Sequence, residues 1–222
     1  MIKLKYTSYN KNLFEAHMMA FDLIDSKKTV LDIGCATGYF AKELKEKDCM
    51  TYGVEIDKIA AKKAMNFCEK VFVGDIKKIS KLNIPREFFD YILFLDVLEH
   101  LENPLQALND AKKFLKKDGK FILSVPNIAH ISVRTRLFLG RFHYSDSGIL
   151  DKDHLRFFTK KTFIELITNA DLKILQLDYP ADFGQIPIFG RFLKKLNKKW
   201  QYLITKLLNP LLAGQFIAVC AF

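Results

Sequence analysis

Residues 30–40 read V-L-D-I-G-C-A-T-G-Y-F: an apolar strand that contains an acid, then a glycine-containing turn, then the start of a helix. This order is typical of the carboxyl edge of a parallel sheet, where open α/β folds bind ligands. A dinucleotide-binding turn would instead have the pattern G-x-G-x-x-G, which places backbone amides under a pyrophosphate. Here Asp32 precedes Gly34 and Gly38, and its carboxylate would repel a phosphate. The segment therefore predicts an amino-acid-like ligand with a positive centre.

Apolar segments of strand length alternate with segments of helical periodicity along the first half of the chain. We expect a helix at 9–25, strands at 29–33, 50–55, 71–73, 90–95 and 119–125, and helices at 39–47, 57–69 and 103–116 between the strands. The alternation predicts an α/β fold with a parallel sheet and helices on both faces. The strands are nearly continuous apolar runs, which is typical of strands buried on both sides.

Four segments in order, residues 30–40, 52–57, 73–76 and 89–101, resemble the class I S-adenosylmethionine-dependent methyltransferases. Within that family the chain looks most like bacterial small-molecule O-methyltransferases of the ubiquinone-methyltransferase type, which are often linked to glycan or lipid modification. The resemblance implies a Rossmann-like fold with a seven-stranded, mostly parallel sheet and an antiparallel last strand. It also implies S-adenosyl-L-methionine as the cofactor and S-adenosyl-L-homocysteine as its product.

The length of 222 residues fits one domain. We divide it into an N-terminal helix (1–27), a cofactor-binding core (28–127), a substrate cap (128–158) and a C-terminal part that completes the sheet (159–222). The cap is rich in arginine, histidine and aromatic residues and follows a strand that ends at the ligand edge. In the last part we expect a helix at 160–170 capped by Thr159, a strand at 172–178, a basic amphipathic helix at 190–208 and a strand at 215–222.

The resemblance implies how individual residues hold the cofactor. Asp32 would bind the methionyl ammonium, directly or through water, and Gly34 would allow its close approach. Glu55 would accept both ribose hydroxyls, as the acid after the second strand does in dinucleotide folds. Asp75 would accept the adenine amino group while Ile76 packs on the ring. The complete set expected to bind the cofactor is Asp32, Gly34, Cys35, Ala36, Gly38, Glu55, Ile56, Asp75, Ile76, Leu95 and Asp96.

Leu95 and Asp96 end the fourth strand, where a backbone carbonyl can take the methionyl amino group. The segment lacks the Asn/Asp-Pro-Pro-aromatic sequence of amino-methylating DNA enzymes. It also lacks the cysteine after proline that pyrimidine-C5 enzymes use as a nucleophile. These two absences disfavour both kinds of flipped-base chemistry.

His154 is the candidate general base, because a hydroxyl acceptor must lose its proton and histidine titrates in the useful range. Asp151 or Asp153 would orient it. The alternative is that His154 and Arg156 only tie the cap to the sheet. His100 is either a second candidate base or a structural histidine.

Three further residues, Asn127, Tyr144 and Arg156, are expected to contact the substrate. The spacing of histidines, cysteines and acids does not predict a metal site, and the four scattered cysteines are expected to be free thiols. No signal peptide or membrane-length apolar segment is evident, so we expect a cytoplasmic protein. Peripheral attachment to the inner face of the membrane is the alternative that stays open.

The net charge of +10 is concentrated near the C-terminus, where no Asp or Glu follows Asp182. On a helical wheel, residues 190–208 separate into a lysine-rich arc and an apolar arc made of Phe192, Leu193, Leu196, Trp200, Leu203, Ile204, Leu207 and Leu208. This pattern is typical of a helix on an anionic membrane surface. It is equally typical of a helix that packs its apolar arc on the core and exposes its lysines.

These observations predict a methyltransferase that moves a methyl group to a hydroxyl of a small molecule or a lipid-linked glycan. Two alternatives stay open. The positive charge favours an RNA methyltransferase, although we expect nucleic acid less than a small molecule or a membrane as partner. A protein that binds the cofactor as a regulator without turnover would have the same motifs.

Overall fold

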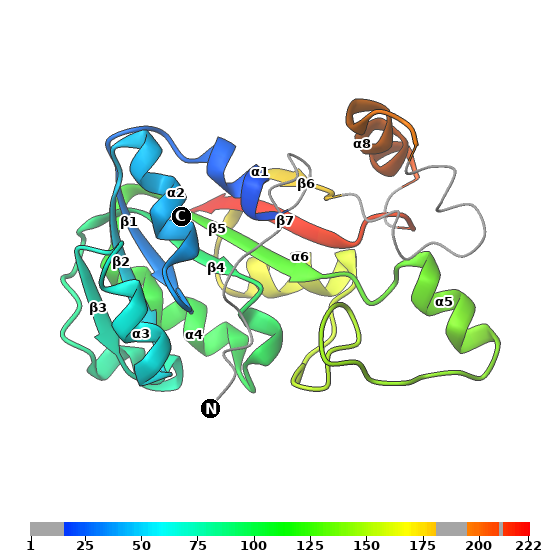
Figure 1. The fold of residues 1–222 in the computed structure, drawn as a ribbon, viewed down its shortest axis with the longest axis horizontal. Coiled ribbons are helices and arrows are strands. Elements are labelled where there is room, and N and C mark those ends of the chain that lie inside the picture. The colour runs from blue at the N-terminus through cyan, green and yellow to red at the C-terminus, as the bar shows by residue number, and fades with distance from the viewer. Residues whose placement is uncertain (1–15, 181–194, 209–210) are drawn as a thin grey trace.

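The computed structural model describes residues 16–180, 195–208 and 211–222 (Figure 1). Its centre is a seven-stranded sheet of order β3-β2-β1-β4-β5-β7-β6. Strands β1 to β5 are parallel, and β7 lies antiparallel between β5 and β6. The strands are β1 Thr29–Ile33, β2 Met50–Glu55, β3 Lys70–Val73, β4 Phe89–Leu95, β5 Leu115–Pro126, β6 Lys173–Asp178 and β7 Gln215–Ala221. The expected Rossmann-like methyltransferase fold is confirmed.

Helices cover both faces of this sheet, as expected. The α-helices are α1 Ala16–Leu23, α2 Tyr39–Leu44, α3 Lys58–Ala64, α4 Pro104–Ala111, α5 Ile131–Phe138, α6 Lys160–Asn169 and α8 Lys198–Leu207. Short 3-10 helices are η1 Lys45–Lys47, η2 Ile76–Lys81, η3 Leu98–His100 and η4 Lys112–Phe114. One core layer packs the sheet against α4 and α6, and the opposite layers pack it against α1, α2 and α3.

Side-chain alternation along β4 explains the two layers. Ile92 and Phe94 lie in the core layer of α4 and α6, whereas Tyr91, Leu93 and Leu95 lie in the layer of α1 and α2. Successive side chains of a strand point to opposite faces. A strand buried on both sides must therefore be apolar at almost every position, which is why the sequence of β4 shows no polar alternation.

Several helices end earlier than periodicity predicts. Helix α3 ends at Ala64 rather than at residue 69, and the helix expected at 103–116 ends as η4 at Phe114. Residues 115–119 already belong to β5, whose pairing with β4 is irregular between Phe89 and Tyr91. Thr159 caps α6 as expected, because its hydroxyl accepts the Thr162 amide in a capping box.

Parallel register places the carboxyl ends of the central strands at one edge of the sheet. Ile33 pairs with Val54 on one side and with Phe94 on the other, while Leu95 pairs with Ser124. The residues that directly follow or end these strands therefore meet there. The cofactor-binding residues expected from the sequence occupy these strand ends.

Of the basic segment 190–208, residues 190–194 lie outside the described residues. Helix α8 buries two polar side chains, Gln201 and Thr205, whereas Trp200 is 57% and Leu207 82% exposed. Gln201 donates to the Leu196 carbonyl and Thr205 donates to the Gln201 carbonyl, so both are hydrogen-bonded inside. Of the apolar arc, Ile204 packs against Leu212, whereas Trp200, Leu203 and Leu207 remain exposed, so only part of the arc packs on the rest of the protein.

Candidate functional site

Two neighbouring cavities open at the carboxyl edge of the sheet. The first, of about 430 Å³, is lined by Glu55, Asp75 and Ile76 among others, and we call it the Glu55 cavity. The second, of about 260 Å³, is lined by Glu99, Asp151 and His154 among others, and we call it the His154 cavity. They share the lining residues Gly34, Ala36, Asp96, Val97 and His100. A ligand can therefore extend from one into the other.

The Glu55 carboxylate is held at the end of β2 by two backbone amides. The Ala36 N–H donates to Oε2 at 2.9 Å, and the Asp57 N–H donates to Oε1 at 2.8 Å. Each oxygen keeps a free acceptor site, because a carboxylate has about four. Glu55 thus keeps acceptor sites for two hydroxyl groups. Asp57 has another task, since its side chain caps α3 through the Ile59 and Ala60 amides.

Most of the residues expected at the cofactor line the two cavities, and three do not. Ile56, Asp75 and Ile76 line the Glu55 cavity, Leu95 lines the His154 cavity, and Gly34, Ala36 and Asp96 line both. The side chain of Cys35 is buried against Gly53 and Cys68. Gly38 has φ +76° and packs against the backbone of Ala64. Cys35 and Gly38 therefore pack inside the turn between β1 and α2 and do not face the cavities.

Asp32 is the third residue outside the cavity linings. It lies in β1 and is only 5% exposed. Burial, and then the nearby Glu55 carboxylate, raise the pKa of Asp32 from 3.8 to about 7. A cationic ligand near this buried acid would favour its ionised form, because opposite charges attract.

Backbone strain marks the boundary between the two cavities. Ala36 has φ +47° and Asp96 has φ +55°, in the left-handed region that non-glycine residues seldom adopt. Asp96 is held there by Ser124, whose hydroxyl donates to its carboxylate at 2.8 Å, and by Gln215, whose amide nitrogen lies 2.8 Å from both oxygens. Such strain clusters at binding sites.

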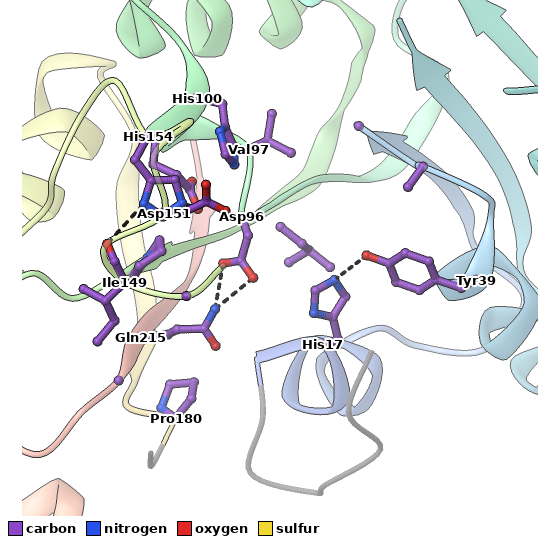
Figure 2. A pocket seen from close by; sticks show the side chains of 17 residues that line it. His17, Tyr39, Asp96, Val97, His100, Ile149, Asp151, His154, Pro180 and Gln215 are labelled. Atoms are coloured by element: carbon purple, nitrogen blue, oxygen red, sulfur yellow. Dashed lines mark hydrogen bonds and ion pairs between the residues drawn. The ribbon is translucent and has the colours of Figure 1, made fainter. Parts of the chain in front are cut away.

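The cap brings His154 to the loop that follows β4. The amides of Leu155 and Arg156 both donate to the Glu99 carbonyl at 2.9 Å. These bonds place the His154 ring 4.8 Å from the His100 ring, centre to centre. Figure 2 shows both histidines and Asp151 on one side of Asp96, with His17 and Tyr39 on the other.

A carbonyl, not a carboxylate, orients His154. Its Nδ1 lies 3.2 Å from the Ile149 carbonyl oxygen, so the expectation that Asp151 or Asp153 would hold the ring is wrong. Asp151 instead accepts the Asp153 amide. Burial, and then the neighbouring His100, lower the pKa of His154. The ring is therefore neutral at physiological pH, with Nε2 as an acceptor.

The three expected substrate residues do not line either cavity. Asn127 is fully buried, and its amide donates to the Ala213 carbonyl and accepts the Ala129 amide. Tyr144 is 60% exposed and contacts Phe142. Arg156 donates twice to the Glu102 carbonyl, at 3.2 and 2.7 Å, so it ties the cap to the core.

One lining residue, His17, had no expected role. It comes from α1, and its Nε2 lies 3.3 Å from the Tyr39 hydroxyl at the wall of the His154 cavity. Burial lowers its pKa, while Asp96 acts in the opposite direction. Nothing in the sequence near His17 signals this position, because it depends on how α1 packs against the sheet.

The raised pKa of Asp32 predicts how the free energy of unfolding of the ligand-free protein depends on pH. The folded protein holds this proton more tightly than the unfolded chain does, so the stabilisation is complete below about pH 4 and is lost as the pH rises through about 7. We expect Asp32 to account for a decline on the order of 4 kcal/mol across that range. Urea unfolding at several pH values should show a shallower decline for Asp32→Asn, and the same decline as wild type for the exposed Asp118→Asn. Parallel curves for wild type and Asp32→Asn would contradict the assignment.

Comparison with known proteins agrees with this geometry. A family model described as a methyltransferase domain matches residues 6–177. An uncharacterized protein of Methanocaldococcus jannaschii is 32% identical over 171 residues, which cover 76% of each chain. The ubiquinone biosynthesis O-methyltransferase of Nitrosomonas europaea is 24% identical over 127 residues, 53% of this chain and 54% of that one. The chain therefore spans about half the length of this ubiquinone enzyme.

Solved structures show the same fold. An S-adenosylmethionine-dependent methyltransferase from Archaeoglobus fulgidus has a TM-score of 0.62 at 18% identity, over 91% of this chain and 89% of that one. The [4+2]-cyclase SpnF has a TM-score of 0.64 at 14% identity, over 99% and 85%. A cyclase among these neighbours illustrates that a fold does not fix a reaction. The family match over most of the chain does fix the family: this chain is a class I S-adenosylmethionine-dependent methyltransferase.

Proposed function

We propose that this methyltransferase transfers the methyl group of S-adenosylmethionine to a hydroxyl of a small molecule. The observation that carries the proposal is the His154 cavity, which adjoins the Glu55 cavity and contains a neutral imidazole. At about 260 Å³ it suits part of a small molecule better than a folded macromolecule. The ubiquinone biosynthesis relatives are O-methyltransferases, which supports a hydroxyl acceptor. A lipid-linked glycan that inserts one sugar would fit the same cavity.

The cofactor fits the Glu55 cavity by its chemistry. Glu55, fixed by two amides, would accept the ribose hydroxyls, and Asp75 with Ile76 would hold the adenine. Asp32 and Asp96 would supply negative charge near the methionyl ammonium. When bound, the cofactor provides a methyl group that its sulfonium has already activated. The protein therefore mainly has to align the acceptor and keep water out.

His154 is the residue that we propose activates the acceptor. Its neutral Nε2 can draw the hydroxyl proton away as the acceptor oxygen forms a bond to the methyl carbon. The carbon–sulfur bond breaks at the same time, and its electron pair stays on sulfur in the neutral S-adenosylhomocysteine. A neutral imidazole within reach of the hydroxyl is a common general base.

Charge in the cavity favours this acceptor over RNA. Among the described residues, the lining of the His154 cavity includes Asp96, Glu99 and Asp151 and contains no lysine or arginine. A phosphate backbone at this entrance would meet like charge. The basic charge of the chain is therefore better explained by another partner.

We infer that this partner is an anionic lipid surface, which α8 would contact. Trp200, Leu203 and Leu207 form an exposed apolar strip, and the exposed Lys199 and Lys206 flank it. Figure 1 shows α8 beside one end of the sheet, apart from the helices that cover its faces. Within the described residues, no helix is long and apolar enough to cross a membrane. An apolar strip bordered by lysines suits an interfacial helix that lies on anionic lipid.

The role of His154 can be tested by turnover. We expect His154→Ala to lower methyl transfer to a small-molecule catechol or phenol about 10²- to 10⁴-fold, because the acceptor proton has lost its route. Affinity for S-adenosylhomocysteine should stay unchanged, since His154 does not line the Glu55 cavity. His143→Ala, at an exposed histidine of the cap, is the matched control. Near-normal turnover of His154→Ala would return His154 to a structural role.

The lipid contact can be tested by sedimentation with vesicles. We expect the protein to pellet with phosphatidylglycerol vesicles but not with phosphatidylcholine vesicles, and binding should weaken as salt rises. Leu203→Ser with Leu207→Ser should abolish pelleting, whereas Phe138→Ser, at a more exposed position on α5, should not. Retention of RNA without any vesicle binding would contradict the inference.

A further inference from the structure

A cluster of three potential metal ligands lies at the wall of the His154 cavity. It consists of Glu99, His100 and His154, and one ligand atom from each lies within 4.8 Å of the other two. Around a tetrahedral cation with bonds of about 2.1 Å, ligand atoms are about 3.4 Å apart, so each pair here needs to approach by at most about 1.4 Å. Small side-chain rotations therefore bring all three atoms within coordination distance.

Glu99 is the unusual member of this cluster. Its residue is 1% exposed, and within residues 16–180, 195–208 and 211–222 neither carboxylate oxygen has a hydrogen-bond partner. The Nε2 atom of His154 is 4.0 Å from Oε1, too far for a hydrogen bond. A buried carboxylate without a partner is strongly destabilising. Its presence is explained if a positively charged group completes its surroundings.

Both histidines are oriented as metal ligands usually are. His100 Nδ1 lies 3.0 Å from the Asp153 carbonyl oxygen, and His154 Nδ1 lies 3.2 Å from that of Ile149. A carbonyl only accepts, so each Nδ1 carries a proton, and Nε2 is the nitrogen left to bind a cation. A second hydrogen bond of this kind, from the far nitrogen to a carbonyl, is typical of metal-bound histidine.

The electrostatic surroundings also favour a cation. Asp96 and Asp151, which line the same cavity as Glu99, add negative charge beside the cluster. Among the described residues that line the His154 cavity, no lysine or arginine offsets them. The nearby Arg156 guanidinium donates to the Glu102 carbonyl.

We propose that Glu99, His100 and His154 bind a divalent cation through one carboxylate oxygen and two imidazole nitrogens. Two imidazoles with one carboxylate suit Zn²⁺, Mn²⁺, Fe²⁺ or Co²⁺ better than Ca²⁺. Three protein ligands leave coordination positions open toward the cavity, as in catalytic metal sites.

The role of the cation rests on the proposed function, whereas its binding does not. In an open position the cation would hold the acceptor hydroxyl oxygen and lower the pKa of that hydroxyl. The hydroxyl would lose its proton to solvent as the acceptor binds, before water is excluded and its oxygen forms the bond to the methyl carbon. His154 would thus activate the acceptor through the cation instead of accepting the proton itself.

Cation binding can be measured without any methyl acceptor. Protein dialysed against EDTA and then freed of the chelator would be titrated with Co²⁺, whose visible absorption reports nitrogen and oxygen ligands. We expect one Co²⁺ per chain, displaced by Zn²⁺, and a higher melting temperature when the metal is present. Glu99→Gln and His100→Ala should each weaken binding at least tenfold, whereas His143→Ala should bind as wild type does.

Glu99→Gln also separates a ligand from a structural residue. Glutamine has nearly the same shape but no charge, so without metal we expect a melting temperature at or above that of wild type, with no rise when Co²⁺ is added. Absence of Co²⁺ absorption in wild type, or equal binding by Glu99→Gln, would overturn the site. If Co²⁺ binds but methyl transfer continues in EDTA, the metal site stands and its proposed role in activating the acceptor is overturned. Co²⁺ binding without transfer to any hydroxyl would support the site while the proposed function fails.

Discussion

The parallel pairing of β1 with β2 and β4 is the constraint on which the rest of the structure depends. It brings Gly34, Glu55 and Asp96 to one edge, although 62 positions of sequence separate the first from the last. Once there, the backbone itself completes the site, because the amides of Ala36 and Asp57 hold Glu55. The apolar runs in these strands bury the sheet on both faces and so keep that edge rigid.

A second set of backbone bonds attaches the cap to this edge. The Glu99 carbonyl accepts two amides from the segment that follows His154, and the Asp153 and Ile149 carbonyls hold the two histidine rings. The chemistry of the His154 cavity thus depends on main-chain atoms that no side-chain motif specifies. These bonds leave Nε2 of the His154 imidazole free of the main chain. Nε2 can accept a proton from the acceptor when no cation is bound, or it can bind a cation that lies between His154 and the acceptor.

The sequence predicted the fold and the cofactor edge well because both depend on local patterns. Strand-length apolar runs and the order of Asp32, Gly34 and Glu55 are readable in a single chain. The acceptor side was predicted less well. Asn127 and Tyr144 were expected on the acceptor side because they follow β5. Asn127 is instead buried and hydrogen-bonded to the Ala213 carbonyl, and Tyr144 lies on the surface.

The cluster of Glu99, His100 and His154 was missed for a related reason. His154 is separated from the adjacent Glu99 and His100 by the whole of α4, β5 and α5, so the three residues do not form a short sequence motif. The Glu-His pair was visible, but only the tertiary structure shows that the Glu99 carboxylate is buried and has no hydrogen-bond partner in the part of the chain that the structure describes. For α8 too the tertiary structure is needed, because sequence periodicity does not show which face of the helix packs against the rest of the protein.

The most direct test of the central claim is calorimetric binding of S-adenosylhomocysteine to wild type and to Glu55→Gln. If Glu55 holds the ribose at the end of β2, the loss of a charge-assisted contact should weaken affinity about tenfold to hundredfold. Glu69→Gln, at an exposed position just before β3, should bind as wild type does. Equal affinity in wild type and Glu55→Gln would contradict the placement of the cofactor at this edge.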